Sequence, residues 1–282
     1  MPTPLPTPTA LQQSMRCWPA WAKQALDAIL SPTATVLDLI RADPAAVLWK
    51  AGLTPDPWQA TLLHADPTHT LLLCGRQMGK STTAAALALR QAFLHPDSLI
   101  LLLSPTLRQS GELFRDKVLR LFHALPPTVP LLRETALSLE LRNGSRIVSL
   151  PESEAGIRGF SGVSLLVIDE ASRVDDALYR AVRPMLAVSR GKLLALSTPF
   201  GKRGWFYSAW EGGGMAWERV RVTADQCPRI TPEFLAEERQ AMGERWFQQE
   251  YFCDFVSTDD AAFDHDSVRR ALAAPGAEPP LF

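Results

Sequence analysis

One segment of the sequence combines residue types and spacing suited to holding phosphate groups. Gly75-Arg76-Gln77-Met78-Gly79-Lys80-Ser81-Thr82 follows the apolar run 71–74 and precedes an alanine- and leucine-rich stretch. Strand, glycine-containing loop and helix in this order form a P-loop, whose backbone N–H groups converge on phosphates near the positive end of the helix. We predict that residues 75–82 bind a nucleotide, with Lys80 on the β- and γ-phosphates and the Ser81 hydroxyl on Mg²⁺. Cys74 stands where the usual pattern has its first glycine.

A pair of carboxylates, Asp169-Glu170, comes directly after the apolar run 165–168. In nucleotide hydrolysis, one carboxylate at such a strand end helps to hold Mg²⁺, and the next orients and polarises the attacking water. We assign Asp169 to Mg²⁺ and Glu170 to the general base. Because neighbouring side chains of a strand point to opposite faces, the end of the strand must redirect Glu170. An acidic loop after a core strand is the simpler interpretation, but the P-loop upstream favours catalysis.

A third apolar run, 192–196, ends in the small residues Ser197-Thr198-Pro199. In a parallel sheet the carboxyl edge of this strand faces the γ-phosphate. Ser197 or Thr198 could then couple hydrolysis to movement by switching a hydrogen bond. The alternative is an ordinary strand followed by a turn at Thr198-Pro199.

Three further polar residues are candidates for nucleotide contacts. Arg76 lies inside the loop, where an arginine could contact the γ-phosphate and stabilise the transition state. Arg158, shortly before the acidic pair, is a candidate for contact with phosphate or with a neighbouring subunit, and both remain open. Gln59 precedes the P-loop strand, and its amide can donate and accept at once, which suits the edge of adenine.

Alternating strands and helices must position these residues. We expect strands at 70–74, 99–103, 164–168, 192–197 and 217–222, and helices at 80–93, 107–123, 175–188, 205–210, 232–242 and 245–251. Alternating apolar residues lead to Asn143-Gly144, a strong hairpin signal, before the chain returns through Ile147-Val148. The predicted fold class is α/β: a P-loop NTPase of the RecA/ASCE-like kind, with a doubly wound, mostly parallel sheet and an inserted β-hairpin.

The chain is expected to divide into four segments. Residues 1–52 would form a disordered, Pro/Thr-rich tip and a helical preface, and residues 53–228 the P-loop ATPase core. Residues 229–263 would form a small helical lid, and residues 264–282 a linker or tail.

Composition sets outer limits on function. Apolar content of 46% and charged content of 21% are ordinary for a globular protein. No apolar run is long enough to span a bilayer, and no secretory signal is visible, so we expect no membrane partner. The four cysteines form no Cys-x-x-Cys pair, which fits a reducing cytoplasm. A net charge of −1 means that any nucleic-acid contact must come from a local basic surface.

These motifs together resemble the ATPase domain of the large terminase subunit of tailed bacteriophages. Arg76-Gln77-Met78-Gly79-Lys80-Ser81 is similar to the variant P-loop of that family, and Pro57-Trp58-Gln59 to its adenine motif. The other matching segments, in the same order as in the family, are Asn143-Gly144-Ser145, Ile157-Arg158-Gly159, Val167-Ile168-Asp169-Glu170-Ala171, Ser197-Thr198-Pro199 and Phe247-Gln248-Gln249-Glu250-Tyr251 with Phe255-Val256. The resemblance covers about Leu53 to Phe263.

The resemblance implies a motor that hydrolyses ATP with Mg²⁺ to move double-stranded DNA into a procapsid. It also implies a homo-oligomeric ring, docking to a portal protein, a small terminase subunit as partner, and action in the cytoplasm of the bacterial host. The family usually continues into a ribonuclease-H-like domain, whereas here residues 264–282 follow Phe263. We therefore expect no nuclease activity from this chain, and we interpret Asp259, Asp260, Asp264 and Asp266 as a solvated acidic linker.

Two other functions are compatible with the motifs. A fragment of a helicase with two RecA-like domains (superfamily 2) shares them, but too little chain follows Glu170 for a second such domain. A nucleotide-binding protein without motor activity, such as a prophage remnant, would be expected to lack Lys80, Asp169 or Glu170. Several basic residues could contact DNA phosphates, or they could simply be charged residues on the surface, and both interpretations remain open. They are Arg180, Arg183, Arg190 and Lys202-Arg203.

Overall fold

The computed structural model describes residues 35–256, except 127, 152–156, 158 and 214–216. Its centre is an eight-stranded sheet with the order β3-β4-β5-β2-β6-β7-β1-β8. The strands are β1 (His69–Cys74), β2 (Leu99–Ser104), β3 (Leu131–Glu134), β4 (Ser138–Leu141), β5 (Arg146–Pro151), β6 (Val163–Asp169), β7 (Lys192–Ser197) and β8 (Glu218–Val222). Only β4 runs against the others in this sheet, so the predicted mostly parallel arrangement is confirmed.

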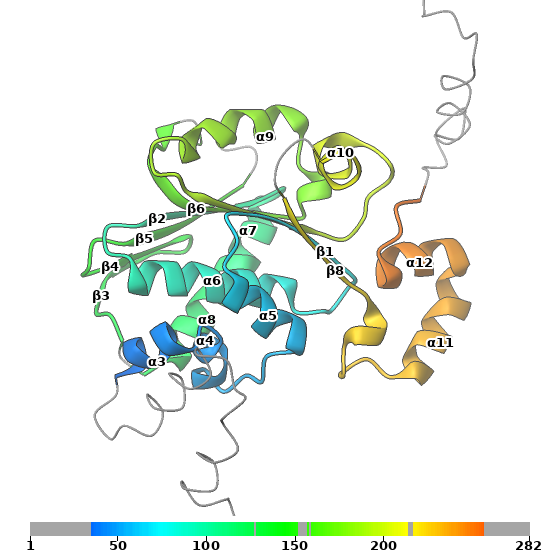
Figure 1. The fold of residues 1–282 in the computed structure, drawn as a ribbon, viewed down its shortest axis with the longest axis horizontal. Coiled ribbons are helices and arrows are strands. Elements are labelled where there is room, and N and C mark those ends of the chain that lie inside the picture. Colours follow the sequence, from blue (N-terminus) through cyan, green and yellow to red (C-terminus); the bar gives the residue numbers. More distant parts are fainter. Residues whose placement is uncertain (1–34, 127, 152–156, 158, 214–216, 257–282) are drawn as a thin grey trace, which may run out of the picture.

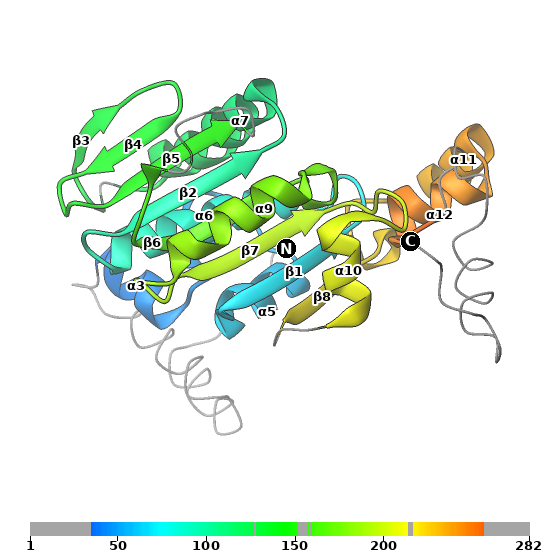
Figure 2. The same ribbon diagram turned by 90° about the horizontal axis from the view of Figure 1, so that it is seen from above.

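Helices cover both faces of the sheet, and a helical pair lies at one end (Figures 1 and 2). One face carries α3 (Val36–Ala42), α4 (Ala46–Lys50), α5 (Pro57–Ala65), α6 (Lys80–Leu94) and α8 (Arg120–Ala124). The other carries α9 (Asp176–Val182) and α10 (Gly204–Gly212), and the end pair is α11 (Pro232–Met242) and α12 (Glu244–Phe252). Shorter helical segments are α7 (Leu107–Leu113), η2 (Phe114–Leu119), η4 (Ala171–Arg173), η5 (Arg183–Leu186) and η6 (Ala224–Gln226).

The two covered faces explain why the central strands are apolar along their whole length. Leu71 and Leu73 of β1 pack into the core beneath α9 and α10, whereas Leu72 and Cys74 pack into the core beneath α6. A strand buried on both sides needs apolar residues at successive positions.

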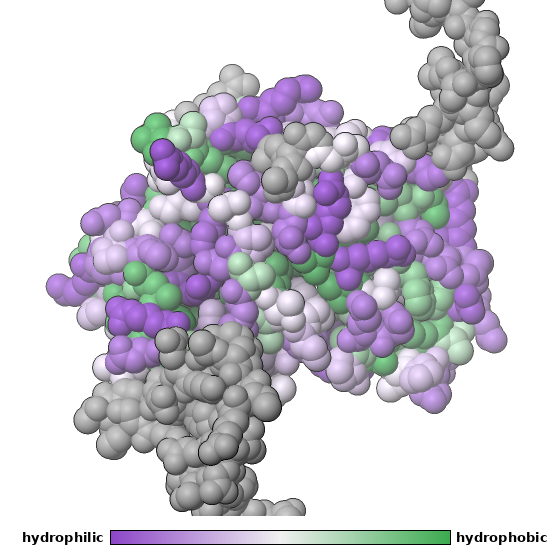
Figure 3. All heavy atoms as spheres, viewed as in Figure 1, coloured by the Kyte–Doolittle hydropathy of each residue, from purple (hydrophilic) through white to green (hydrophobic). Residues whose placement is uncertain are grey.

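Hydrophilic side chains dominate the outer face shown in Figure 3, with hydrophobic ones scattered between them.

The helical preface is partly described. α3 and α4 pack on the core through Leu39, Ile40, Val47 and Leu48, which are all buried. α3 begins with a capping box, in which Thr35 and Asp38 satisfy each other's free backbone N–H groups. The predicted tip and the first part of the preface lie outside the described residues, and the division of the chain into four segments stays a prediction.

The predicted hairpin is present as β4 and β5, and it is joined to the central sheet. β5 pairs in parallel register with β2 over Leu99–Ser104, so the returning strand is a full member of the central sheet. Asn143 forms the turn and also donates its side-chain amide to the carbonyl of Ala92 at 2.8 Å. The edge strand β3 was not predicted, because all its residues are exposed and show no apolar alternation.

No helix in the described part of the chain is long and apolar enough to cross a membrane. Cys74, Cys227 and Cys253 are buried free thiols, and Cys17 lies outside the described residues.

Candidate active site

The strand order brings the three sequence motifs to one edge of the sheet. β7 lies between β1 and β6, and all three run parallel. Their carboxyl ends therefore place the loop 75–79, the acidic pair and Ser197-Thr198 side by side. Residues 76–79 of the loop, Glu170 and Thr198 border a cavity of about 580 Å³. The residues that line it are Arg76, Gln77, Met78, Gly79, Lys80, Ser81, Thr82, Gln109, Lys117, Glu170, Arg173 and Thr198.

Backbone geometry shapes the loop for close approach. Gln77 and Gly79 have positive φ values of 60° and 83°, and α6 begins directly afterwards at Lys80. A Cβ atom on Gly75 would lie 2.9 Å from the carbonyl oxygen of Tyr251, so glycine is needed where the loop meets α12. Met78 borders the cavity and is itself fully buried in the core beneath the loop.

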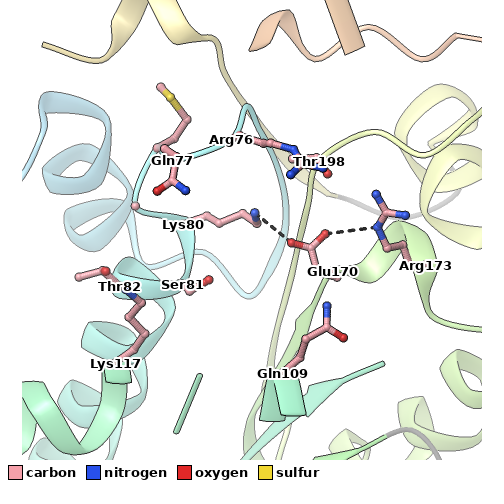
Figure 4. A pocket seen from close by; sticks show the side chains of 12 residues that line it. Arg76, Gln77, Lys80, Ser81, Thr82, Gln109, Lys117, Glu170, Arg173 and Thr198 are labelled. Carbon is pink, nitrogen blue, oxygen red and sulfur yellow. Dashed lines mark ion pairs between the residues drawn. The ribbon is translucent and has the colours of Figure 1, made fainter. Parts of the chain in front are cut away.

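Lys80 and Glu170 meet at the centre of the cavity. Lys80 Nζ lies 3.0 Å from Glu170 Oε1, and Arg173 Nε lies 3.8 Å from Glu170 Oε2 (Figure 4). Glu170 has left-handed backbone angles, φ 50° and ψ 42°, which confirms that the strand end redirects this side chain. Such a conformation is costly for a non-glycine residue and is common at functional sites.

The charges of this group depend on one another. Burial, followed by the neighbouring Glu170 carboxylate, raises the pKa of Asp169 to about 6, against the opposing effects of Lys80, the Glu170 N–H and the Ser81 hydroxyl. Burial lowers the pKa of Lys80, but Glu170 and Asp169 outweigh it, so the pKa of Lys80 is raised. Lys80 is therefore a charged ammonium, whereas the ionised form of Asp169 is disfavoured by burial and by Glu170.

Asp169→Asn is expected to stabilise the protein at neutral pH. The ordinary aspartate pKa is 3.8 and the pKa of Asp169 in the fold is about 6, so the charged form opposes folding above pH 6. The substitution should add about 3 kcal/mol to the free energy of unfolding at pH 8. This gain should shrink as the pH falls from 6 and disappear below pH 3.8, because Asp169 is then protonated in the unfolded chain as well as in the folded protein. Denaturant unfolding of the natural chain and the variant, at pH 8 and below pH 3.8, measures this gain in stability. A variant that is less stable than the natural chain at pH 8 would refute the electrostatic explanation.

Arg76 is held at the mouth of the cavity by α12. Its Nε donates to Glu250 Oε2, and its backbone N–H donates to the Glu250 carbonyl at 2.9 Å. Glu250 is only 7% exposed, and its other carboxylate oxygen accepts from Gln249 at 3.2 Å. A γ-phosphate contact by Arg76, as predicted, would therefore compete with an existing ion pair.

The end of β7 is joined to the turn that carries Glu170. Ser197 Oγ lies 2.6 Å from Ser172 Oγ and accepts from the Ser172 N–H at 3.2 Å. Ser172 Oγ also donates to the Thr198 carbonyl at 2.7 Å. Pro199 is buried directly after Thr198. This network is the kind of connection that the predicted coupling role requires, and the role itself stays a prediction.

A second cavity, of about 690 Å³, adjoins the first along the P-loop. Its lining includes apolar residues before and within the start of α5, together with Gln59 and Arg229. The Gln59 amide is engaged inside the protein: Oε1 accepts from the Asp56 N–H at 2.8 Å, and Nε2 donates to Thr83 Oγ1 at 2.8 Å and to the Gly79 carbonyl at 3.3 Å. In this structure Gln59 thus holds the P-loop against α5, and the predicted adenine contact would require these bonds to rearrange.

Several residues of the site were not predicted. Arg173 follows Glu170 by three positions, and its guanidinium lies 4.1 Å from the centre of the Phe200 ring. Glu250, Gln109 and Lys117 reach the site from distant helices, and no local sequence pattern singles them out for this role. Arg158 and the acidic residues after 256 lie outside the described residues.

Comparison with known proteins identifies the family. A family model described as "Terminase large subunit, T4likevirus-type, N-terminal" matches residues 71–270, which is well over half of the chain. The chain belongs to this family. Its relatives include the terminase large subunit of Thermus virus P23-45, 27% identical over 75% of this chain and 51% of the relative. Another is the terminase large subunit of Escherichia phage T5, 25% identical over 77% of this chain and 52% of the relative. The chain thus spans about half the length of these relatives.

Solved terminase structures share the fold. The ATPase domain of the Thermus phage P74-26 large terminase superposes with a TM-score of 0.62 at 24% identity, covering 74% of this chain and 96% of that domain. The large terminase of a thermophilic bacteriophage, solved in complex with ADP, gives a TM-score of 0.60 at 14% identity, over 71% of this chain and 53% of that one. The sheet seen in this chain is therefore the terminase ATPase fold.

Proposed function

We propose that this chain hydrolyses ATP and serves as the ATPase of a viral DNA-packaging motor. The observation that carries the proposal is the meeting of Lys80 and Glu170, 3.0 Å apart, above a P-loop and beside the buried Asp169. A phosphate-binding cation and a candidate base thus share one cavity at the carboxyl edge of a parallel sheet, where ligands of such sheets bind.

Each residue then has a chemical task. An arriving triphosphate attracts Lys80, which leaves Glu170 free to accept a proton from the attacking water. Backbone N–H groups of residues 76–82 bind the phosphates, and Arg76, once released from Glu250, stabilises charge on the γ-phosphate. A hydrogen bond at Ser197 or Thr198 responds to the loss of that phosphate.

Ser81 and Asp169 suit a Mg²⁺ ion. Asp169 is a buried carboxylate whose pKa is raised by burial and by the neighbouring Glu170, and the nearby Ser81 hydroxyl acts in the opposite direction. Two hard oxygen donors in this position fit Mg²⁺, which is usually held by few protein ligands together with phosphates and water. Such an ion would neutralise charge developing on the transferred phosphoryl group.

The motor assignment is supported by the family and by the position of basic residues. Terminase large subunits are the named relatives, and the neighbour from the thermophilic bacteriophage was solved with ADP. Arg203, in the loop after β7, lies 5.0 Å from the centre of the Phe200 ring, on which Arg173 also packs. We propose that this loop meets double-stranded DNA and that the chain works in the host cytoplasm as a ring, with a portal protein and a small terminase subunit.

ATP turnover by the purified chain, measured with and without double-stranded DNA at two salt concentrations, tests the motor. Stimulation by DNA that weakens at high salt is expected, because phosphate contacts release counterions. Turnover that ignores DNA at both salt concentrations would contradict direct coupling to DNA. A complete lack of turnover would favour a nucleotide-binding protein without motor activity.

A further inference from the structure

The helix that passes beside the P-loop changes its geometry next to the nucleotide cavities. α7, η2 and α8 follow one another without interruption from Leu107 to Ala124, and the middle segment is a π-helix. π-helical turns inside α-helices are rare and occur frequently at functional sites. This segment packs against α6, with Phe114 and Val118 fully buried, and carries Lys117 on its partly exposed side.

Lys117 lies where the two cavities join. Four residues line both of them: Gln77, Gly79, Thr82 and Lys117. The first cavity also contains Lys80 and Glu170, the proposed phosphate end, whereas the second is lined by apolar residues such as Leu48 and Leu53. Figure 4 shows Lys117 on the same side of the first cavity as Thr82, away from Glu170.

The charge of Lys117 has no protein partner in the part of the chain that the structure describes. The other cations lining the first cavity are engaged: Lys80 and Arg173 with Glu170, and Arg76 with Glu250. Arg229, which lines the second cavity, pairs with both carboxylate oxygens of Asp56. A lysine ammonium is a compact point charge with three donors, well suited to phosphate oxygens.

We propose that Lys117 is a nucleotide-binding residue that contacts the α-phosphate. This rests on the proposed nucleotide site and deepens it. A nucleotide with its β- and γ-phosphates at Lys80 and its base among the apolar residues must pass its α-phosphate through the junction of the cavities. The P-loop and the start of α6 bind the α- and β-phosphates in such sites, and Thr82 belongs to that turn.

The test is the dissociation constant of ADP with Mg²⁺, measured by titration calorimetry on three variants of the full chain. Lys117→Met keeps the length of the side chain but removes the charge, and should weaken ADP binding about tenfold. Lys117→Arg should recover most of the affinity. Arg120→Met removes a charge from an exposed position on the same helix and should leave the affinity within about twofold. Thermal unfolding of each variant shows whether it is folded.

Inorganic orthophosphate distinguishes a contact with the α-phosphate from a general effect of positive charge on the whole site. It carries a single phosphate, so its binding at Lys80 should be almost unchanged by Lys117→Met. Equal weakening of ADP and orthophosphate, or equal effects of Lys117→Met and Arg120→Met, would overturn the assignment. If Lys117→Met has no effect while Lys80→Ala prevents binding, only the role of Lys117 fails. If Lys80→Ala leaves ADP binding intact, the nucleotide site itself is wrong.

Discussion

Replacing Glu170 with Gln is expected to lower ATP turnover by at least about 10²-fold while ATP stays bound. The amide keeps the size of the side chain but cannot take a proton from water. It also loses the ion pair with Lys80, so Lys80 becomes freer to engage phosphate, and the affinity for ATP should be equal to or higher than that of the natural chain. Phosphate release under single-turnover conditions, together with equilibrium binding of ATP, measures the two effects separately.

The matched control for this experiment is Glu218→Gln. Glu218 is an exposed carboxylate at the start of β8. Because β8 runs parallel to β1, Glu218 lies at the end of the sheet opposite the P-loop, and its loss should leave turnover unchanged. If Glu170→Gln turns over ATP at the rate of this control, the general base lies elsewhere.

The second large effect is expected for Lys80→Ala, which should weaken the binding of ADP with Mg²⁺ by about 100-fold or more. The variant removes the cation that faces the phosphates and leaves Asp169 and Glu170 without it. Because Lys80 lowers the pKa of Asp169, that pKa should rise further in the variant. The negative charge left in the cavity then repels a polyanionic ligand.

Lys50→Ala serves as the control for Lys80→Ala, since Lys50 lies over the ring of Trp49 and does not line the first cavity. Equilibrium titration of both variants with ADP and Mg²⁺ gives the comparison. An affinity of Lys80→Ala within about twofold of the Lys50→Ala value would show that the loop 75–79 does not hold phosphates.

Local sequence patterns predicted the strands and the loop of the site, because the apolar runs and the glycine-containing loop each lie within a few neighbouring residues. The unbroken apolar run Leu99–Leu103 predicts a strand that is buried on both faces of a sheet. The residues on either side of the loop before Lys80 predict that it joins a strand to a helix. The order of the strands brings β7 between β1 and β6. That order is a property of the whole fold, and it was not predicted from the sequence.

Contacts between distant segments were beyond the sequence patterns. Arg76 and Glu250 are 174 positions apart, and the residues around each of them do not predict the ion pair. Lys117 reaches the cavities from a helix whose apolar pattern predicts only a core element, and the π-helical turn leaves no simple signal in the sequence. The adenine contact of Gln59 stays a prediction, and its hydrogen bonds to Gly79 and Thr83 depend on tertiary packing that no local pattern shows.

The most direct measurement is a crystal structure of the chain with Mg²⁺ and a nonhydrolysable ATP analogue. The expected result has the triphosphate along residues 76–82, Lys80 moved from Glu170 to the β- and γ-phosphates, and a water molecule hydrogen-bonded to Glu170 next to the γ-phosphate. The ion should lie between Ser81 and Asp169, and the base in the second cavity beside Arg229. A nucleotide bound elsewhere, or one bound here with Lys80 still paired to Glu170, would contradict the proposed hydrolytic site.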